Sequence, residues 1–271
     1  MEILLQWLQD TINHSGAVDN LTTGLQEYNA TVWAYAQAVA ENVVKPISLA
    51  VLALFLMLEF ANLYKKIDSG GGVFQFQMLL PILIKLAFAK LLMENFSVFI
   101  LAIQGLGVLL VQRMQDVLPA INTKGTTDIS SLKDAVDDLG FFEQVWAGVI
   151  LLLTILVAKI ATLIAKFAIV MRFFEMYLLT AIAPLPISAM PSEEYSQITK
   201  NFFKMFGAIS LSTVIMYIVL SFYSVLGASL VRQTGSDFLS MSIGILVYNI
   251  LLIFLVVKTF TLSKGLLGVS A

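Results

Sequence analysis

Ionisable side chains inside or beside apolar runs are the residues of this sequence with the clearest chemical potential. They are Lys85, Lys90, Glu94, Lys159, Lys166, Arg172 and Glu175. A charge is costly in hydrocarbon, so such residues usually pair, line an aqueous path or extend to the membrane surface. Lys90 and Glu94 are spaced to meet on one helix face, and so are Arg172 and Glu175. For Lys90, Glu94 and Lys159 two interpretations stay open, structural pairing and a polar lumen. Lys166 and Arg172 are expected to extend to the cytoplasmic edge.

Patterns for catalysis or metal binding are not found in the sequence. There is no cysteine and a single histidine, His14, in a polar stretch, so a disulfide framework or a thiolate nucleophile is excluded. Gly70–Gly72 lacks the Lys-Ser/Thr that follows the glycines of a P-loop, and predicts a turn. Glu193 and Glu194 would point about 100° apart on a helix, which does not make an acid/base pair. We therefore predict no enzyme activity, no cofactor, no metal and no small-molecule substrate.

Composition indicates the class of protein. Apolar residues make up 59% of the chain and charged residues 13%, whereas soluble domains carry roughly 25% charged residues. Several long apolar runs then predict an all-α, polytopic membrane protein. A net charge of −2 gives the whole chain no signature of polyanion binding.

The apolar runs predict about five transmembrane helices. An amphipathic helix within the extracellular region 1–43 precedes them, with Trp33 and Tyr35 as possible interface anchors. The remaining chain, 44–271, is predicted to form a single membrane domain with an extracellular loop at 111–144. The expected spans are Val44–Tyr64, the later part of Leu79–Leu110, Val145–Val170, Met205–Leu230 and Met241–Lys258.

A proline-broken segment follows the third expected span. The run from Met176 to Met190 would be about 22 Å long as a helix, which is short of the ~30 Å hydrocarbon thickness. Pro184 and Pro186 remove backbone donors, and we expect them to push Ala183 and Leu185 towards extended geometry. A lipid-exposed helix does not tolerate such a break. The segment is therefore predicted to be a re-entrant hairpin that returns to the side from which it came.

The distribution of lysine and arginine supports this topology. Cytoplasmic loops are enriched in these residues. With the N-terminus outside and a re-entrant hairpin, the cytoplasmic side receives Lys65, Lys66, Lys166, Arg172, Lys200, Lys204, Lys258 and Lys264. The outer side keeps Arg113, Lys124, Lys133 and Arg232. A fully spanning segment would reverse this bias. The C-terminus is then inside, and the regions 1–43 and 111–144 form an acidic outer face.

Three motifs resemble a known family. They are Arg172-Phe173-Phe-Glu175-x-Tyr177, Ala181-Ile-Ala-Pro184-Leu-Pro186 and Lys200-Asn201-Phe-Phe-Lys204. Together they are similar to the TrbL-type polytopic inner-membrane subunit of type IV secretion (conjugation) systems, in the compact form of Gram-positive conjugative elements. The resemblance is specific over about residues 160–230 and agrees in layout elsewhere. It implies a multi-pass protein of the bacterial plasma membrane, without enzyme activity, in the DNA and protein transfer channel.

The resemblance also implies partners. These are membrane lipids, secretion ATPases, and extracellular stalk or cell-wall subunits of the same system. We expect a homo-oligomeric ring of about five or six copies. A cytoplasmic basic face of Lys65, Lys66, Lys200 and Lys204 would meet the ATPases, anionic lipid or translocating DNA. The alternative is a stand-alone small-solute transporter or channel, although no internal repeat supports it. A weaker option is an assembly platform that seats an extracellular stalk and conducts nothing.

Overall fold

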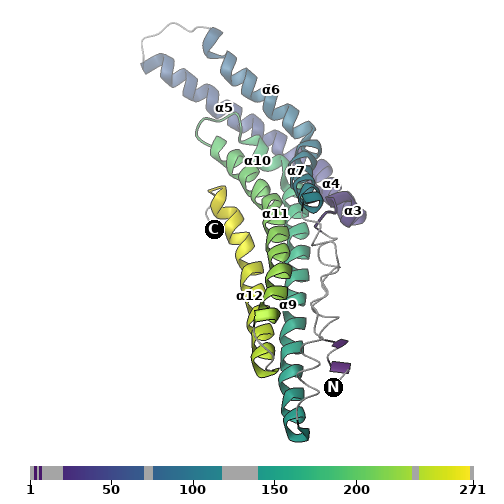
Figure 1. Ribbon diagram of the computed structural model, residues 1–271. Helices are drawn as coiled ribbons and strands as arrows, with labels where there is room; N and C mark the ends of the chain where they lie inside the picture. Colours follow the sequence, from purple (N-terminus) through teal and green to yellow (C-terminus); the bar gives the residue numbers. More distant parts are fainter. Residues whose placement is uncertain are drawn as a thin grey trace. The chain divides into compact units, whose positions relative to one another are not determined.

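The protein is all-helical over the residues that its computed structural model describes (Figure 1). These are residues 3–4, 6–7, 21–69, 76–117, 140–233 and 238–268. The main helices are α3 (Leu25–Tyr28), α4 (Ala30–Val39), α5 (Lys45–Ser69), α6 (Leu80–Glu94), α7 (Phe96–Val117), α9 (Phe141–Ile182), α10 (Pro184–Ser188), α11 (Ser196–Gln233) and α12 (Phe238–Leu266). A π-helical segment η1 (Ala40–Val44) joins α4 to α5, and a 3-10 turn η2 (Phe76–Met78) precedes α6.

Five stretches of the described chain are long and apolar enough to cross a membrane. They are Ala30–Asp68, Phe96–Val117, Phe142–Ile182, Ser196–Tyr223 and Phe238–Leu266. This confirms the prediction of about five membrane-spanning helices. Their bounds are wider than expected at several ends, because the helices continue past the apolar runs into polar residues such as Lys65–Asp68 and Ser196–Lys204.

The first span begins well before its expected start at Val44. A continuous helical path runs from α4 through η1 into α5, and Pro46 lies in the second position of α5. Proline lacks an N–H and its ring would clash with the carbonyl four residues earlier, that of Asn42. The wider turn of η1 avoids this conflict, since the Lys45 N–H bonds to Ala40 O, five residues back. The helix passes the proline without ending.

The amphipathic pattern expected before the first span is only partly visible in side-chain exposure. Trp33 and Ala36 of α4 are buried, whereas Tyr35 and Val39 are exposed. Trp33 is thus a buried residue, and Tyr35 is the aromatic side chain of α4 that remains available at a surface.

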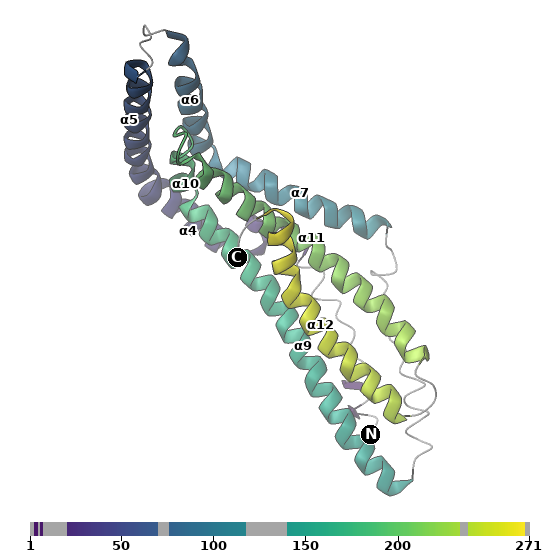
Figure 2. The same ribbon diagram turned by 90° about the vertical axis from the view of Figure 1, so that its left-hand side faces the viewer.

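The second apolar region, Leu79–Leu110, is divided into two helices. Asn95 leaves the helical conformation at φ −116° and ψ 24°. Its side-chain and backbone N–H groups both bond to the Leu91 carbonyl oxygen, at 3.0 and 3.1 Å. Helix α6 has 15 residues, so it is too short to span a bilayer, and the 22 residues of α7 supply the candidate span. Helices α5 and α6 lie side by side as an antiparallel pair (Figure 2).

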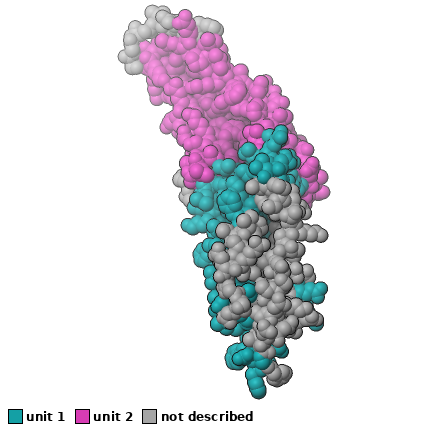
Figure 3. All heavy atoms as spheres, viewed as in Figure 1, with its two compact units in different colours: residues 1–23, 107–172, 211–263 teal, residues 24–106, 173–210, 264–271 magenta. Residues whose placement is uncertain are grey.

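The chain divides into two compact units (Figure 3). One comprises Met1–Thr23, Gly107–Arg172 and Leu211–Ser263, and the other Gly24–Leu106, Phe173–Ser210 and Lys264–Ala271. The first has a core that includes Leu151, Tyr217 and Leu252, all fully buried. Within it, Tyr223 stacks on Tyr248 with ring centroids 4.0 Å apart. The second unit buries Met93 and other apolar residues, and contains the proline segment.

Candidate functional site

The α10 turn, defined as Ala183–Tyr195, is the structural counterpart of the expected proline break. Helix α9 continues unbroken through the Arg172–Tyr177 motif and ends at Ile182. Ala183 has φ −50° and ψ −41°, and Leu185 lies within helix α10, so the expectation of extended geometry at these two residues is wrong. Pro184 and Pro186 lie in the first turn of α10, where a missing N–H leaves no bond unmade. The prolines therefore end one helix while opening another.

Side chains of the surrounding helices satisfy the carbonyl groups of this turn. Thr199 Oγ1 donates to the Pro186 carbonyl oxygen at 2.6 Å, across thirteen positions of sequence. Ser188 Oγ donates to Leu185 O at 2.7 Å. Buried carbonyls without a partner are costly, so these hydroxyls stabilise the chain reversal between α9 and α11.

The α10 turn packs on α5, α6 and η1, all within the same unit. Pro184 and Ile187 of the short helix are buried against them. On the following segment, Phe55 of α5 contacts the ring of Tyr195 at a centroid distance of 5.3 Å. The proline segment is thus a docked element and not a free loop.

A carboxylate in the middle of an apolar helix holds the second half of the turn. Glu59 of α5 is buried, and its Oε2 accepts a hydrogen bond from the Glu193 backbone N–H at 3.1 Å. Glu193 in turn accepts from Lys66 Nζ at 2.9 Å. The hydrogen bond and charge of Lys66, with the charge of Lys85, hold the pKa of the Glu193 carboxyl below its usual value.

The aromatic residues of the Arg172–Tyr177 motif fix the short helix α3. Phe173 is buried and stacks on Tyr28 with ring centroids 3.8 Å apart. Tyr177 Oη donates to Leu25 O at 2.7 Å. The Leu25 N–H bonds to Gln104 Oε1 of α7 at 3.3 Å. The motif therefore ties together segments that are distant in sequence.

The charged members of that motif lie in the same helix with different surroundings. Arg172 is buried, at 5% exposure. Glu175 is half-buried, and its Oε2 has no hydrogen-bond partner among the described residues.

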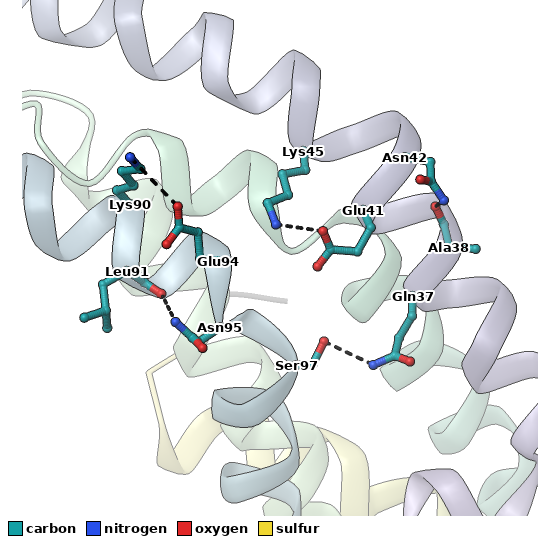
Figure 4. A network of polar contacts seen from close by, with 10 residues as sticks. All are labelled: Gln37, Ala38, Glu41, Asn42, Lys45, Lys90, Leu91, Glu94, Asn95 and Ser97. Atoms are coloured by element: carbon teal, nitrogen blue, oxygen red, sulfur yellow. Dashed lines mark hydrogen bonds and ion pairs between the residues drawn. The ribbon is translucent and has the colours of Figure 1, made fainter.

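The expected pair of Lys90 and Glu94 is present but loose. Their charged atoms are 3.9 Å apart and both side chains are more than half exposed, so the pair contributes little to stability. A second ion pair, Lys45 Nζ to Glu41 Oε2 at 2.7 Å, lies in the same region (Figure 4). Ser97 accepts a hydrogen bond from Gln37 of α4 there, at 3.2 Å.

The other lysines that the sequence singled out have different surroundings. Lys159 of α9 lies over the Trp7 ring, with Nζ 5.1 Å from the centroid, which is a cation–π contact. Lys65, Lys66, Lys200 and Lys204 are all exposed in one unit. Asn201 accepts a hydrogen bond from Gln197 Nε2 at 2.9 Å. Among the described residues, no group of three or more His, Cys, Asp or Glu could hold a metal ion.

Sequence reasoning missed the residues that hold the turn in place. Glu59 carried a signal, because it is an acidic residue inside an apolar run and such residues have a role by default. Gln104 carried a weaker signal of the same kind, because it is a polar amide inside the apolar run Leu79–Leu110. Thr199 carried none, since a hydroxyl in a polar stretch does not show which distant carbonyl it will meet.

These helices define a multi-pass α-helical membrane protein. Residues 12–184 match the family described as TrbL/VirB6 plasmid conjugal transfer like protein. The match covers more than half of the 271 residues, and the chain belongs to this family. It is accordingly a non-enzymatic membrane component of conjugal transfer machinery. No curated protein and no solved structure matches the chain. The match includes Arg172–Tyr177 and Pro184, and ends before Pro186 and the Lys200–Lys204 motif.

Proposed function

We propose that this chain is a structural or channel subunit of a conjugative type IV secretion system, in the compact form of Gram-positive elements. It helps to form the membrane passage or platform through which DNA and protein are transferred. The observation that carries the proposal is the presence of five candidate spans in a chain of this family. Family membership disfavours the alternative of a stand-alone small-solute transporter.

The direct test is complementation in a conjugating strain. Deleting the gene should abolish transfer of the element while the relaxase still nicks its DNA, and the wild-type chain should restore transfer. Transfer that continues unchanged without the gene would contradict the proposed function. Loss of nicking together with transfer would place the defect before the membrane step.

The topology that we propose has the N-terminus outside, the C-terminus inside, and Met176–Met190 as a re-entrant hairpin. The chain reversal at the α10 turn and the exposed Lys200 and Lys204 that follow it support a return to the cytoplasmic side. We also propose that the amphipathic helix of the region 1–43 lies on the outer surface. Buried Trp33 and exposed Tyr35 support a two-faced helix there.

Single cysteines in this cysteine-free chain test the topology. Ser192 and Ser263 are buried and would resist labelling on either side, so exposed positions are preferable. On intact cells an impermeant thiol reagent should label Glu27→Cys and Glu143→Cys. It should label Glu194→Cys and Leu266→Cys only after permeabilisation. Labelling of Glu194→Cys on intact cells would rule out the re-entrant hairpin.

The partners that we propose are other copies in a ring of about five or six, the secretion ATPases, and extracellular stalk or cell-wall subunits. The basic face of Lys65, Lys66, Lys200 and Lys204 is the surface offered to ATPases, anionic lipid or DNA. Lys66 also forms an ion pair with Glu193, so it is left unchanged in the test variant. Replacing Lys65, Lys200 and Lys204 with Gln should lower transfer without dissociating the ring, whereas Lys90→Gln, on a different helix, should not. Equal transfer frequencies in the triple variant and the wild type would show that this basic face has no role in transfer.

A further inference from the structure

The short helix α3 is held through its backbone by polar side chains of two candidate spans. The Leu25 N–H donates to Gln104 Oε1 of α7 at 3.3 Å, and the Leu25 carbonyl accepts from Tyr177 Oη of α9 at 2.7 Å. All three side chains are buried, and all three residues belong to the same compact unit. One turn of chain that is not part of a span is therefore docked against two helices that are.

The position of Gln104 in the sequence places this contact inside the hydrocarbon. The nearest charged residues on its two sides are Glu94 and Arg113. The charge-free part of α7 between them, Phe96–Gln112, is about 26 Å long as a helix, close to the ~30 Å hydrocarbon thickness. Gln104 is the middle residue of this run, about 12 Å from either end. The Leu25 backbone thus lies at a depth without lipid-borne hydrogen-bond partners, where Gln104 and a tyrosine hydroxyl supply them.

The other face of α3 is polar and exposed. Gln26 and Glu27 are both exposed, and Glu27 Oε2 accepts an exposed hydrogen bond from the Gly24 N–H at 3.3 Å. A carboxylate that faces hydrocarbon is costly. By contrast, α7 exposes apolar side chains above and below the contact, since Val98 and Leu106 are each 63% exposed. The surface that lipid cannot cover at this depth is therefore that of α3.

We propose that α3 lines a water-filled passage through the membrane, with Gln26 and Glu27 facing the water and Leu25 facing the protein. The proposal rests on the proposed function, in which the chain helps to form a passage or a platform, and it names a segment of the passage wall. Backbone outside the spanning helices is tolerated at membrane depth where it is buried in protein or lines a water-filled cavity. Helix α3 meets one of these conditions on each face, and a platform that conducts nothing needs no water there.

Single cysteines in this cysteine-free chain test the lining. The full-length variants are treated in permeabilised cells with a charged, hydrophilic methanethiosulfonate, which reaches both membrane surfaces but not the hydrocarbon. The thiolate is the reactive form, and it is scarce in apolar surroundings. We expect Gln26→Cys and Glu27→Cys to react more than about tenfold faster than the three controls Leu25→Cys, Val98→Cys and Leu106→Cys. Leu25 is the buried residue of the same turn, and the two α7 residues flank the contact.

The same adducts test whether the water belongs to the route of transfer. Intact donor cells that carry Gln26→Cys or Glu27→Cys are treated with the reagent before mating. We expect the conjugation frequency to fall relative to the untreated cells of the same variant. Treated cells with the cysteine-free wild type should transfer at their untreated frequency.

Three results would overturn the proposal. Reaction at Gln26→Cys and Glu27→Cys as slow as at Leu106→Cys would show that lipid or another protein covers the polar face. Reaction at Val98→Cys or Leu106→Cys as fast as at Glu27→Cys would place the contact outside the hydrocarbon. Fast reaction at Gln26→Cys and Glu27→Cys with no loss of transfer would make the water a recess apart from the route. The proposed function fails by a different result, unchanged transfer after deletion of the gene, whatever the labelling pattern.

Discussion

Prolines interrupt long apolar helices at two places in this molecule, with opposite results. At Pro46 the helix continues, because the π-helical turn η1 lets the Lys45 N–H reach Ala40 O and the ring avoids the preceding turn. At Pro184 and Pro186 helix α9 ends at Ile182 and the chain reverses. Both sites keep helical backbone angles close to the proline, so the presence of proline alone does not determine whether the helix continues or ends.

The difference lies in where the side chains come from that bond to backbone carbonyls near each proline. Around Pro46 the partners are local, since Ser48 Oγ bonds to Val44 O four residues earlier. At the α10 turn one essential partner is distant, because Thr199 from the next helix reaches the Pro186 carbonyl. A break stabilised from within one helix becomes a bulge, and a break stabilised by another helix becomes a turn.

The largest effect is expected from removing both prolines of the turn. In Pro184→Ala/Pro186→Ala the new N–H groups can bond to the carbonyls of Thr180 and Ile182, so α9 can continue and the α10 turn undocks. We expect transfer to be abolished while the protein still inserts, as measured by conjugation frequency and membrane fractionation. Transfer at the wild-type frequency would mean that the distant contacts suffice and the prolines are incidental.

Removing the distant partner should give the next largest effect. Thr199→Val keeps the side-chain shape and leaves the Pro186 carbonyl without its hydroxyl donor. Because the Ala189 N–H still bonds to Pro186 O at 3.3 Å, we expect a loss of about 0.5–1.5 kcal/mol in unfolding free energy, measured by denaturant titration in detergent. Ser196→Ala is the matched control, because its exposed 3.3 Å bond to Glu193 O is replaceable by water. Equal losses in the two variants would contradict a special role for Thr199.

A smaller effect is expected at the other proline. Pro46→Ala restores an N–H and allows the helix to lose its π turn, but the partners there are local in either form. We expect the unfolding free energy to change by less than about 1 kcal/mol and transfer to stay near the wild-type frequency. A defect as large as that of the double proline variant would show that the bulge, like the turn, is structurally required.

The smallest effect concerns Glu193 at the rim of the turn. Its pKa is lowered in the folded protein by Lys66 and Lys85, so its contribution to stability is present above the unfolded pKa of about 4.3. That contribution is lost as the pH falls through the lower folded value. Glu193→Gln should therefore have a slightly lower Tm than wild type at pH 7, and the difference should vanish as the pH falls through the lowered pKa of Glu193. A difference that grows on acidification would have the wrong sign for this ion pair.

The sequence predicted what depends on local composition and periodicity. Runs such as Met241–Lys258 predicted spans because twenty or so apolar residues have few alternatives, and the spacing of Lys90 and Glu94 predicted their contact. It did not predict the backbone of Ala183, because the bias of a residue before proline against helical angles was overridden by packing on α5 and α6. Nor did it reveal Thr199 or Gln104 as partners of the turn and of α3, since each bond joins atoms that only the tertiary structure brings together.

The π turn η1 carries a consequence for how this helix can change over time. Buried residues recur in α4 and η1 at Trp33, Ala36 and Ala40, and in α5 at Ser48 and Leu52, about one position later than an uninterrupted α-helix would place them. The segment Ala40–Val44 behaves as an inserted residue absorbed into a turn. A single-residue deletion there should restore an uninterrupted α-helix and leave the buried faces of α4 and α5 aligned as they are now. The length of this first helix is thus adjustable at one point without rebuilding either half.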